Sequence, residues 1–370
     1  MGPMFSLTSR KDIEDLILGA TILGTGGGGD PKEGLKLLDE ALKLRGKIDI
    51  VKLDELPKDS IIVVPYFVGT IAPTAKTKKP IRIEEPIKKA FEEMKNYLGK
   101  EIAGVLASEI GGLNTAIALY VGAKLGLPAV DGDLLGRAAP ELHQCTVHIF
   151  DIPMYPSVIV TSTGNIVLVK EYSDIDDYEA IARYLSVLDG KAAAVVDTPL
   201  TIEQAEKAMV KDTLSLCYKL GKNVREAREK GENPVEAIVK TLNGWKIFEG
   251  VVEKYTWKDE GGFLVGETLV RGTGKWSGHS LKTWIKNEHI MAWLDNKPIV
   301  MSPDLIMFVL DDGEPITNTD LKEGVKVNVV AAKAPDMWRT PKGLELFGPR
   351  HFGFDYDYVP VEELVKRHGI

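Results

Sequence analysis

The sequence predicts an α/β protein made of a three-layer α/β/α domain with a mostly parallel sheet and a smaller all-β, barrel-like domain. The first domain is indicated up to residue 243, where apolar β-type runs alternate with helical segments of about ten residues or more. The second is indicated from Gly244, where short runs alternate apolar and polar residues between Gly, Asp and Asn turns. The 370 residues suffice for two or three domains.

We place the α/β domain at 1–243, the β domain at 244–335, and a C-terminal return at 336–370 that packs on the first domain. Helices are expected at 12–23, 31–45, 84–97, 112–125, 174–188, 201–230, 234–242 and 361–368, with a helical turn at 134–139. Strands of the first domain are expected at 48–53, 61–68, 102–107, 128–130, 146–152, 157–170 (a hairpin) and 192–196. Those of the second are expected at 250–258, 262–270, 280–285, 290–294, 305–310 and 326–332. Thr8 or Ser9 is expected to cap the first helix and Asp30 the second, where Pro31 suits the first turn.

Composition excludes several classes of function. A net charge of −8 argues against a nucleic-acid binder, which needs a basic face to replace phosphate counterions. Two cysteines, Cys145 and Cys217, are too few for a disulfide framework and form no Cys-x-x-Cys pair, so a reducing compartment is the simplest interpretation. The N-terminus meets charge too soon for a secretory signal, and no apolar stretch approaches the roughly 20 residues of a membrane helix. We therefore expect a cytoplasmic protein with no membrane partner.

Carboxylates follow two of the predicted buried strands. One strand ends at Glu109 and another at Asp131-Gly132-Asp133. Because the carboxyl ends of parallel strands meet at one edge of a sheet, these acids should converge, where they could act as a general acid/base pair or bind a divalent cation. We assign them as catalytic residues and name Asp131 and Asp133 as the metal ligands, for zinc, magnesium or manganese. The alternative is that the two aspartates only cap the next helix and that Glu109 is solvated.

Arg137 follows the second strand closely. Its planar guanidinium could pair with a carboxylate of the site or clamp an anionic substrate group, so it joins the catalytic candidates. The alternative is a structural salt bridge with Glu141, four residues further on.

Four consecutive glycines, Gly26, Gly27, Gly28 and Gly29, precede the second helix. Their backbone N–H groups could form an anion-binding nest. No Gly-Lys-Ser/Thr follows, and a helix precedes the run where a dinucleotide fingerprint needs a strand, so no nucleotide cofactor is expected. A tight helix–helix turn is the alternative, but four glycines exceed what a turn requires, and we favour close approach of the backbone to a ligand.

The remaining candidates are weaker. His143, Cys145 and His148 could supply metal ligands, but on a strand His148 would face away from the other two. Trp338 and Phe352 are expected in an interdomain seam, whose arginines need carboxylate partners if buried. The residues assigned to substrate binding are Gly26, Gly27, Gly28, Gly29, Asp30, Asn114, Glu141, Arg339 and Arg350.

Several segments, taken in order, resemble the S-methyl-thiohydantoin desulfurase family, whose members often accompany or fuse to hydantoinase or oxoprolinase subunits. The resemblance covers nearly the whole chain. It is carried by residues 23–31 (LGTGGGGDP), 109–114 (EIGGLN), 131–133 (DGD), 136–141 (GRAAPE), 287–289 (NEH), 338–341 (WRTP) and 348–355 (GPRHFGFD).

The resemblance implies the same two-domain fold and action on five-membered cyclic ureides or thioureides. The expected reaction is attack of water on C2 of a thiohydantoin-like ring with loss of sulfide or a thiol, Glu109 or Asp133 serving as base and Arg137 with the glycine amides holding negative charge. One alternative is a hydantoinase/oxoprolinase-type amidohydrolase or its accessory subunit. Another is a non-catalytic ligand-binding partner of a hydantoinase. A small-molecule substrate, a hydantoinase/oxoprolinase subunit as partner, and a homo-oligomer are expected.

Overall fold

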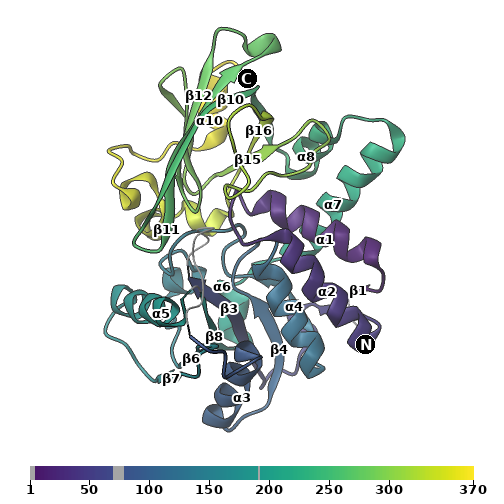
Figure 1. Ribbon diagram of the computed structural model, residues 1–370, viewed down its shortest axis with the longest axis vertical. Helices are drawn as coiled ribbons and strands as arrows, with labels where there is room; N and C mark the ends of the chain where they lie inside the picture. Colours follow the sequence, from purple (N-terminus) through teal and green to yellow (C-terminus); the bar gives the residue numbers. More distant parts are fainter. Residues whose placement is uncertain (1–4, 70–78, 191) are drawn as a thin grey trace.

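The computed structural model describes residues 5–69, 79–190 and 192–370, and it contains two sheets that occupy opposite ends of the molecule (Figure 1). The protein is of mixed α/β type, as predicted. Strands from the first part of the chain form sheet A, and strands from Trp245 onward form sheet B.

Sheet A is mixed in direction, which corrects the prediction of a mostly parallel sheet. Its strands are β1 (Phe5–Leu7), β2 (Ile48–Val51), β3 (Ile61–Gly69), β4 (Ile102–Ala107), β5 (Ala129–Asp133), β6 (Ser157–Val160), β7 (Ile166–Val169), β8 (Ala192–Thr201) and β9 (Val210–Lys211). Their order is β1-β2-β5-β4-β3-β8-β6-β7, with β9 on β5. Only the block β2-β5-β4-β3 is parallel within the described residues. Beyond β3 the sheet continues with β8, which runs antiparallel to both β3 and β6. The β6–β7 hairpin completes this antiparallel part of the sheet.

Helices cover both faces of sheet A, so three layers are present. One face packs against α2 (Pro31–Arg45), α3 (Pro86–Leu98), α4 (Asn114–Leu125) and α7 (Thr213–Lys230). Outside this layer, α1 (Arg10–Leu23) packs on α2 and α7, and α8 (Pro234–Leu242) packs on α7 and on sheet B. The other packs against α5 (Ile175–Asp189) and α6 (Ile202–Ala208). Successive side chains of β3 point to opposite faces of the sheet. Val63 is buried on the face covered by α3 and α4, and Ile62 and Val64 are buried on the face covered by α5 and α6. Burial of each such side chain contributes about 1.5–3 kcal/mol.

Predicted helix caps are present, but three predicted elements are wrong. The helical turn expected at 134–139 is an irregular loop with bends. Ser9 accepts from the Asp12 N–H at the start of α1, and Asp30 accepts from the Lys32 N–H at the start of α2. The helix expected over 201–230 is interrupted by β9, because this segment pairs with β5 and Asp212 then adopts a φ of +61°. The strand expected over 146–152 is a 3₁₀ helix, η2 (Thr146–Phe150). Both the N–H and the hydroxyl of Thr146 bond to the Leu134 carbonyl, so this segment turns back on the loop after β5 and joins no sheet.

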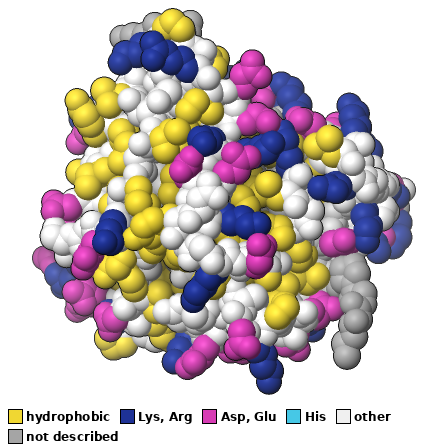
Figure 2. Space-filling model, turned by 90° about the horizontal axis from the view of Figure 1, so that it is seen from below, with side chains coloured by type: hydrophobic (Ala, Val, Ile, Leu, Met, Phe, Trp, Pro, Cys, Tyr) yellow, Lys and Arg dark blue, Asp and Glu magenta, His cyan; other side chains and the backbone are white. Residues whose placement is uncertain are grey.

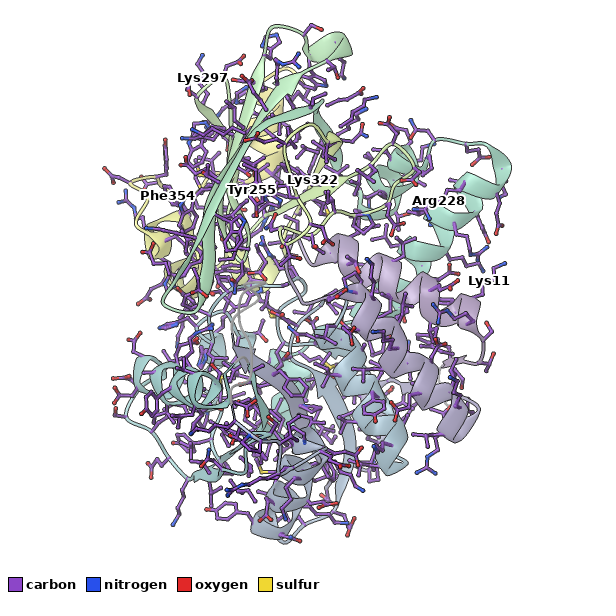
Figure 3. All side chains as sticks on the ribbon, in the orientation of Figure 1. Lys11, Arg228, Tyr255, Lys297, Lys322 and Phe354 are labelled. Carbon is purple, nitrogen blue, oxygen red and sulfur yellow. The ribbon has the colours of Figure 1, made fainter. Side chains whose placement is uncertain are left out.

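Sheet B is antiparallel throughout and curls into a half-barrel. It consists of β10 (Trp245–Glu260), β11 (Phe263–Gly272), β12 (Ser280–Lys286), β13 (Glu288–Leu294), β14 (Lys297–Met301), β15 (Leu305–Val309) and β16 (Lys326–Ala332). The order β14-β13-β12-β11-β10-β16-β15 leaves β14 and β15 as edges, so the predicted barrel is open. Tyr255 on β10 lies in this half-barrel (Figure 3), and its hydroxyl donates to the Asn318 carbonyl at 2.5 Å.

The C-terminal segment contacts both parts of the molecule. The 3₁₀ helix η4 (Asp336–Arg339), α9 (Pro341–Phe347) and η5 (Pro349–Phe352) precede the last helix, α10 (Val361–Arg367). Trp338 and Phe347 are buried in the core of sheet A, as a return to the first domain requires. Val361 and Val365 are buried in the core of sheet B, whereas the whole segment was expected to pack on the first domain. The last helix lies there because its apolar face is buried against the half-barrel. The domain boundaries themselves stay a prediction.

On the face seen in Figure 2, acidic and basic side chains are interspersed around hydrophobic ones. Such mixing is ordinary for a protein surface. Within the described part of the chain, no helix combines the length and the apolar character that crossing a membrane requires.

Candidate active site

A cavity of about 620 Å³ lies between the two sheets, at the carboxyl ends of β3 and β4. The glycine loop 26–30, the loop after β5, the β12–β13 connection and the loop 317–320 complete its wall. Ligand sites of open α/β sheets occur at this edge, and the volume suits a small organic molecule. Much of the wall is apolar, through Val64, Val68, Leu113, Leu142 and Met154.

Glu109 lines this cavity directly after β4, as the sequence predicts. Its Oε1 accepts a hydrogen bond from the Asn114 side chain at 2.6 Å, and its Oε2 accepts one from the Ala139 N–H at 3.1 Å. Burial nevertheless raises the pKa of Glu109 to about 7. The carboxyl group can therefore gain or lose a proton near neutral pH.

Glu288 is the second acid of the cavity and was not among the predicted site residues. It begins β13 and is only 3% exposed. Burial raises its pKa well above the usual range, and the nearby charge of Glu109 raises it further. Its Oε2 has no hydrogen-bond partner in the described residues. The signal that could have identified it is a lone acid at the head of the apolar run Ile290 to Leu294.

The glycine run is packed tightly against both halves of the molecule. A Cβ on Gly27 would lie 1.9 Å from Oε1 of Glu288, and one on Gly28 would lie 2.4 Å from Cα of Gly111. Gly28 also has a φ of +81°, which side chains rarely adopt. The Gly28 carbonyl accepts the N–H groups of Leu113 and Asn114 at 3.0 and 3.1 Å. The run thus makes a tight turn whose missing side chains leave room for the Glu288 carboxylate, and it also lines the cavity. Binding of a ligand by its amides stays a prediction.

Asp131 and Asp133 do not line the cavity. Asp131 accepts the N–H of Ser215 at 2.9 Å and also its hydroxyl, in the first turn of α7. Oδ2 of Asp133 accepts the N–H groups of Leu135 and Gly136 at 2.9 and 2.7 Å. These are structural contacts, but they differ from the alternative considered, because no helix follows β5 directly: Asp131 bonds to α7, and Asp133 bonds to the loop after β5. Oδ1 of Asp133 has no hydrogen-bond partner among the described residues, and the binding of a divalent cation by the two aspartates stays a prediction.

Arg137 is fully buried and joins the two halves of the molecule. Its Nε donates to the Ala138 carbonyl, and its two terminal nitrogens donate to the carbonyls of Pro303, Asp304 and His289 and to Oγ1 of Thr25, all at 2.9–3.0 Å. All five N–H donors are therefore used. No N–H group of Arg137 is left free for the expected clamp on an anionic substrate, and its hydrogen-bond partners do not include Glu141.

The predicted site residues fall into two groups, those that line the cavity and those that do not. Those that line the cavity are Gly26, Gly27, Gly28, Gly29, Asp30, Glu109, Asn114 and Glu141. Those that lie outside it are Asp131, Asp133, Arg137, Arg339 and Arg350. Arg339 pairs with Asp304 and Glu362 at 2.8 Å, and exposed Arg350 pairs with Asp355 and Asp357 at 2.8 and 3.0 Å.

The far end of the cavity carries a buried polar cluster that the sequence did not reveal. Tyr66 lines the wall, and its hydroxyl donates to Asp197 at 2.6 Å; Tyr178 donates to the same oxygen at 2.8 Å. Burial raises the pKa of Asp197 to about 6. Cys145 lies on the same wall, and burial raises its pKa above the usual range, so the thiol stays protonated.

The charge balance of the cavity is negative. Arg183 is the one Arg or Lys side chain among the described residues of the wall, and Glu179 lies 2.5 Å from its Nε. Asp30, Glu33, Glu109, Glu141, Glu288 and Asp320 are acidic members of the wall. Such a cavity suits a neutral or cationic molecule better than the anionic group expected from the sequence.

Fold and cavity together define an α/β protein with a half-barrel and a partly open cavity lined by the half-buried Glu109 and the buried Glu288. The chain belongs to the S-Me-THD-like family, which confirms the resemblance drawn from the sequence. The N-terminal domain of that family matches residues 11–171, and the C-terminal domain matches residues 173–361.

A crystal structure of a protein from Chromobacterium violaceum is similar over 96% of this chain and 100% of its own, with a TM-score of 0.79 and 23% sequence identity. This likeness supports the fold alone. The search of curated proteins gives no match.

Proposed function

We propose that this protein hydrolyses a five-membered thiohydantoin or hydantoin-type ring, with water attacking C2 and sulfide or a thiol leaving. The observation that carries the proposal is the pair Glu109 and Glu288. One is half-buried and the other fully buried, they come from different halves of the molecule, both line one cavity, and both have raised pKa values. The family to which the chain belongs supports the choice of ring. The acidic wall supports a neutral ring with N–H donors.

The two acids take different roles because their proton affinities differ. Glu109, with a pKa of about 7, is ionised in part of the molecules at neutral pH and serves as general base. Glu288, whose pKa is raised well above the usual range, keeps its proton and serves as general acid. Asn114 and the Ala139 N–H orient the Glu109 carboxylate through its two oxygens.

For an S-methylated thiohydantoin the step balances as follows. Glu109 takes a proton from water as the water oxygen bonds to C2, and the C2–S bond then breaks as Glu288 gives its proton to the departing sulfur. The proton held by Glu109 is returned to the ring nitrogen that was doubly bonded to C2. The C2 hydroxyl loses its remaining proton to solvent as the C2 carbonyl forms, and solvent restores the proton of Glu288. The products are hydantoin and methanethiol, with no change of oxidation state.

The test is release of thiol from S-methyl-thiohydantoin by the purified chain and by Glu109→Gln. Glutamine keeps the shape but cannot accept the proton, so kcat should fall by about 10²–10⁴-fold. Glu203→Gln on exposed α6 is the matched control, since its side chain is 82% exposed. In the wild type, kcat/KM should fall as pH drops through about 7, where Glu109 becomes protonated.

Different products would point elsewhere. An N-carbamoyl or other ring-opened acid would mean an amidohydrolase, and tight binding of the ring without turnover would mean a ligand-binding partner of a hydantoinase. Full activity of Glu109→Gln would remove the acid pair from the mechanism. The expected hydantoinase/oxoprolinase partner, the homo-oligomer and the cytoplasmic location stay predictions.

A further inference from the structure

A second cluster of chemically active side chains lies at the edge of the same cavity. Glu141 and His143 belong to the loop after β5, and His351 belongs to η5 near the C-terminus. Their candidate ligand atoms all lie within 4.8 Å of one another. Oε2 of Glu141 is 2.5 Å from Nε2 of His351 and 3.8 Å from Nδ1 of His143.

The orientation of His143 is that of a metal ligand. Its Nδ1 is buried and has no hydrogen-bond partner in the described part of the chain, although it is directed at the cluster. Its Nε2 lies 2.9 Å from Oδ1 of Asp176 in the first turn of α5. A carboxylate on one ring nitrogen fixes the tautomer and leaves the other nitrogen as a free electron-pair donor, the arrangement seen around metal-bound imidazoles.

We propose that Glu141, His143 and His351 bind a divalent transition metal ion, with Zn²⁺ as the best fit. Two imidazoles and one carboxylate are a ligand set that zinc takes in catalytic sites, with a fourth position left open. Zinc–nitrogen and zinc–oxygen bonds are about 2.0–2.2 Å long, and ligand atoms within 4.8 Å of one another can converge on one ion through side-chain rotation. Glu141 and Gln144 line the cavity, so the ion lies at its wall. The proposal stands apart from the proposed reaction and from the expected site at Asp131 and Asp133.

Lys286 gives the proposal an internal check. Its ammonium group bonds to Oε1 of Glu141, the oxygen that does not face the histidines. A cation at this place is repelled by the ammonium charge while sharing its carboxylate. Removal of that charge should therefore strengthen metal binding, an effect that a merely structural hydrogen-bonded cluster does not produce.

The experiment is titration of the chelator-treated full chain with ZnCl₂ by calorimetry, and with CoCl₂ by visible absorption. We expect one ion per chain and a Co²⁺ spectrum of low coordination number. His143→Ala and His351→Ala should each weaken Zn²⁺ binding by about 100-fold or more, and Asp176→Asn by about 10-fold. His279→Ala is the matched control, because His279 is exposed and pairs with Asp295, at the start of β12 and the end of β13, and neither residue lines the cavity.

Thermal melting of each variant shows whether it is folded. Lys286→Met should bind Zn²⁺ several-fold more tightly than the wild type, and a misfolded protein could not show that gain. Absence of a stoichiometric ion in the wild type would overturn the proposal. So would unchanged affinity in folded His143→Ala and His351→Ala.

Discussion

Replacement of Asp133 by asparagine separates a structural acid from a catalytic one. The side chain is fully buried, and its Oδ2 accepts two backbone N–H groups, from Leu135 and Gly136. Asparagine keeps a carbonyl oxygen for both amides and removes the ionisable group. Because Asp133 does not line the cavity, Asp133→Asn should keep its thiol-releasing activity.

The size of the stability effect follows from the pKa of Asp133. Burial raises it from 3.8 to about 7, so the folded state holds a proton that the unfolded state has already lost over this interval. The stabilisation is fully present below pH about 4 and is lost as pH rises through about 7. A pKa difference of about 3 corresponds to about 4 kcal/mol. The variant has no such proton. Between pH 4 and pH 8 the free energy of unfolding of the wild type should therefore fall by about 4 kcal/mol relative to that of the variant.

Guanidinium unfolding of both proteins at several pH values between 4 and 8 measures this difference. Glu109 and Asp197 also titrate in this range, but they are present in both proteins and cancel in the comparison. If the two curves stay parallel across the whole range, the burial of Asp133 does not have the effect described. Loss of activity as large as in Glu109→Gln would return Asp133 to the catalytic residues.

Two further substitutions test the glycine run and the buried arginine. Gly27→Ala places a methyl group 1.9 Å from Oε1 of Glu288 and should displace that carboxylate, which lowers kcat with little change in stability. Adding Glu288→Asp to the same chain should restore part of the activity. A fully active Gly27→Ala would refute the contact. Arg137→Met removes the donors to five oxygens and should destabilise the protein by about 3–5 kcal/mol in denaturant melts. Arg350→Met on the surface is the control and should melt like the wild type. Equal melting of both variants would contradict the role of Arg137.

Local sequence signals predicted the elements whose cause is local. Asp30 with Pro31 starts a helix because its side chain and the proline ring satisfy the first turn, whatever lies around them. The 146–152 segment has a strand-like composition, but its hydrogen bonds go to Leu134, and the helix over 201–230 is interrupted by pairing with β5. Both outcomes depend on partners distant in sequence, which propensity and periodicity do not report.

The candidate site shows the same division. An acid at the end of a buried strand can face the cavity, as Glu109 does, or bind backbone N–H groups elsewhere, as Asp131 does at α7 and Asp133 does in the loop after β5. The sequence pattern does not distinguish these cases. Glu288 reaches the cavity from the other sheet, so only the packing of the halves reveals it. Arg137 looked like a substrate clamp because its true acceptors, backbone carbonyls, carry no sequence signature.

The two acids come from different sheets, so the geometry of the site depends on how the two halves of the molecule are held together. Glu109 follows β4 and Glu288 begins β13, so their separation depends on the seam that Arg137 secures. A ligand that touches both acids must strengthen the seam by the same free energy that the seam adds to its binding. Saturating ligand should therefore raise the melting temperature, and a loosened seam should weaken the binding of molecules that never touch Arg137.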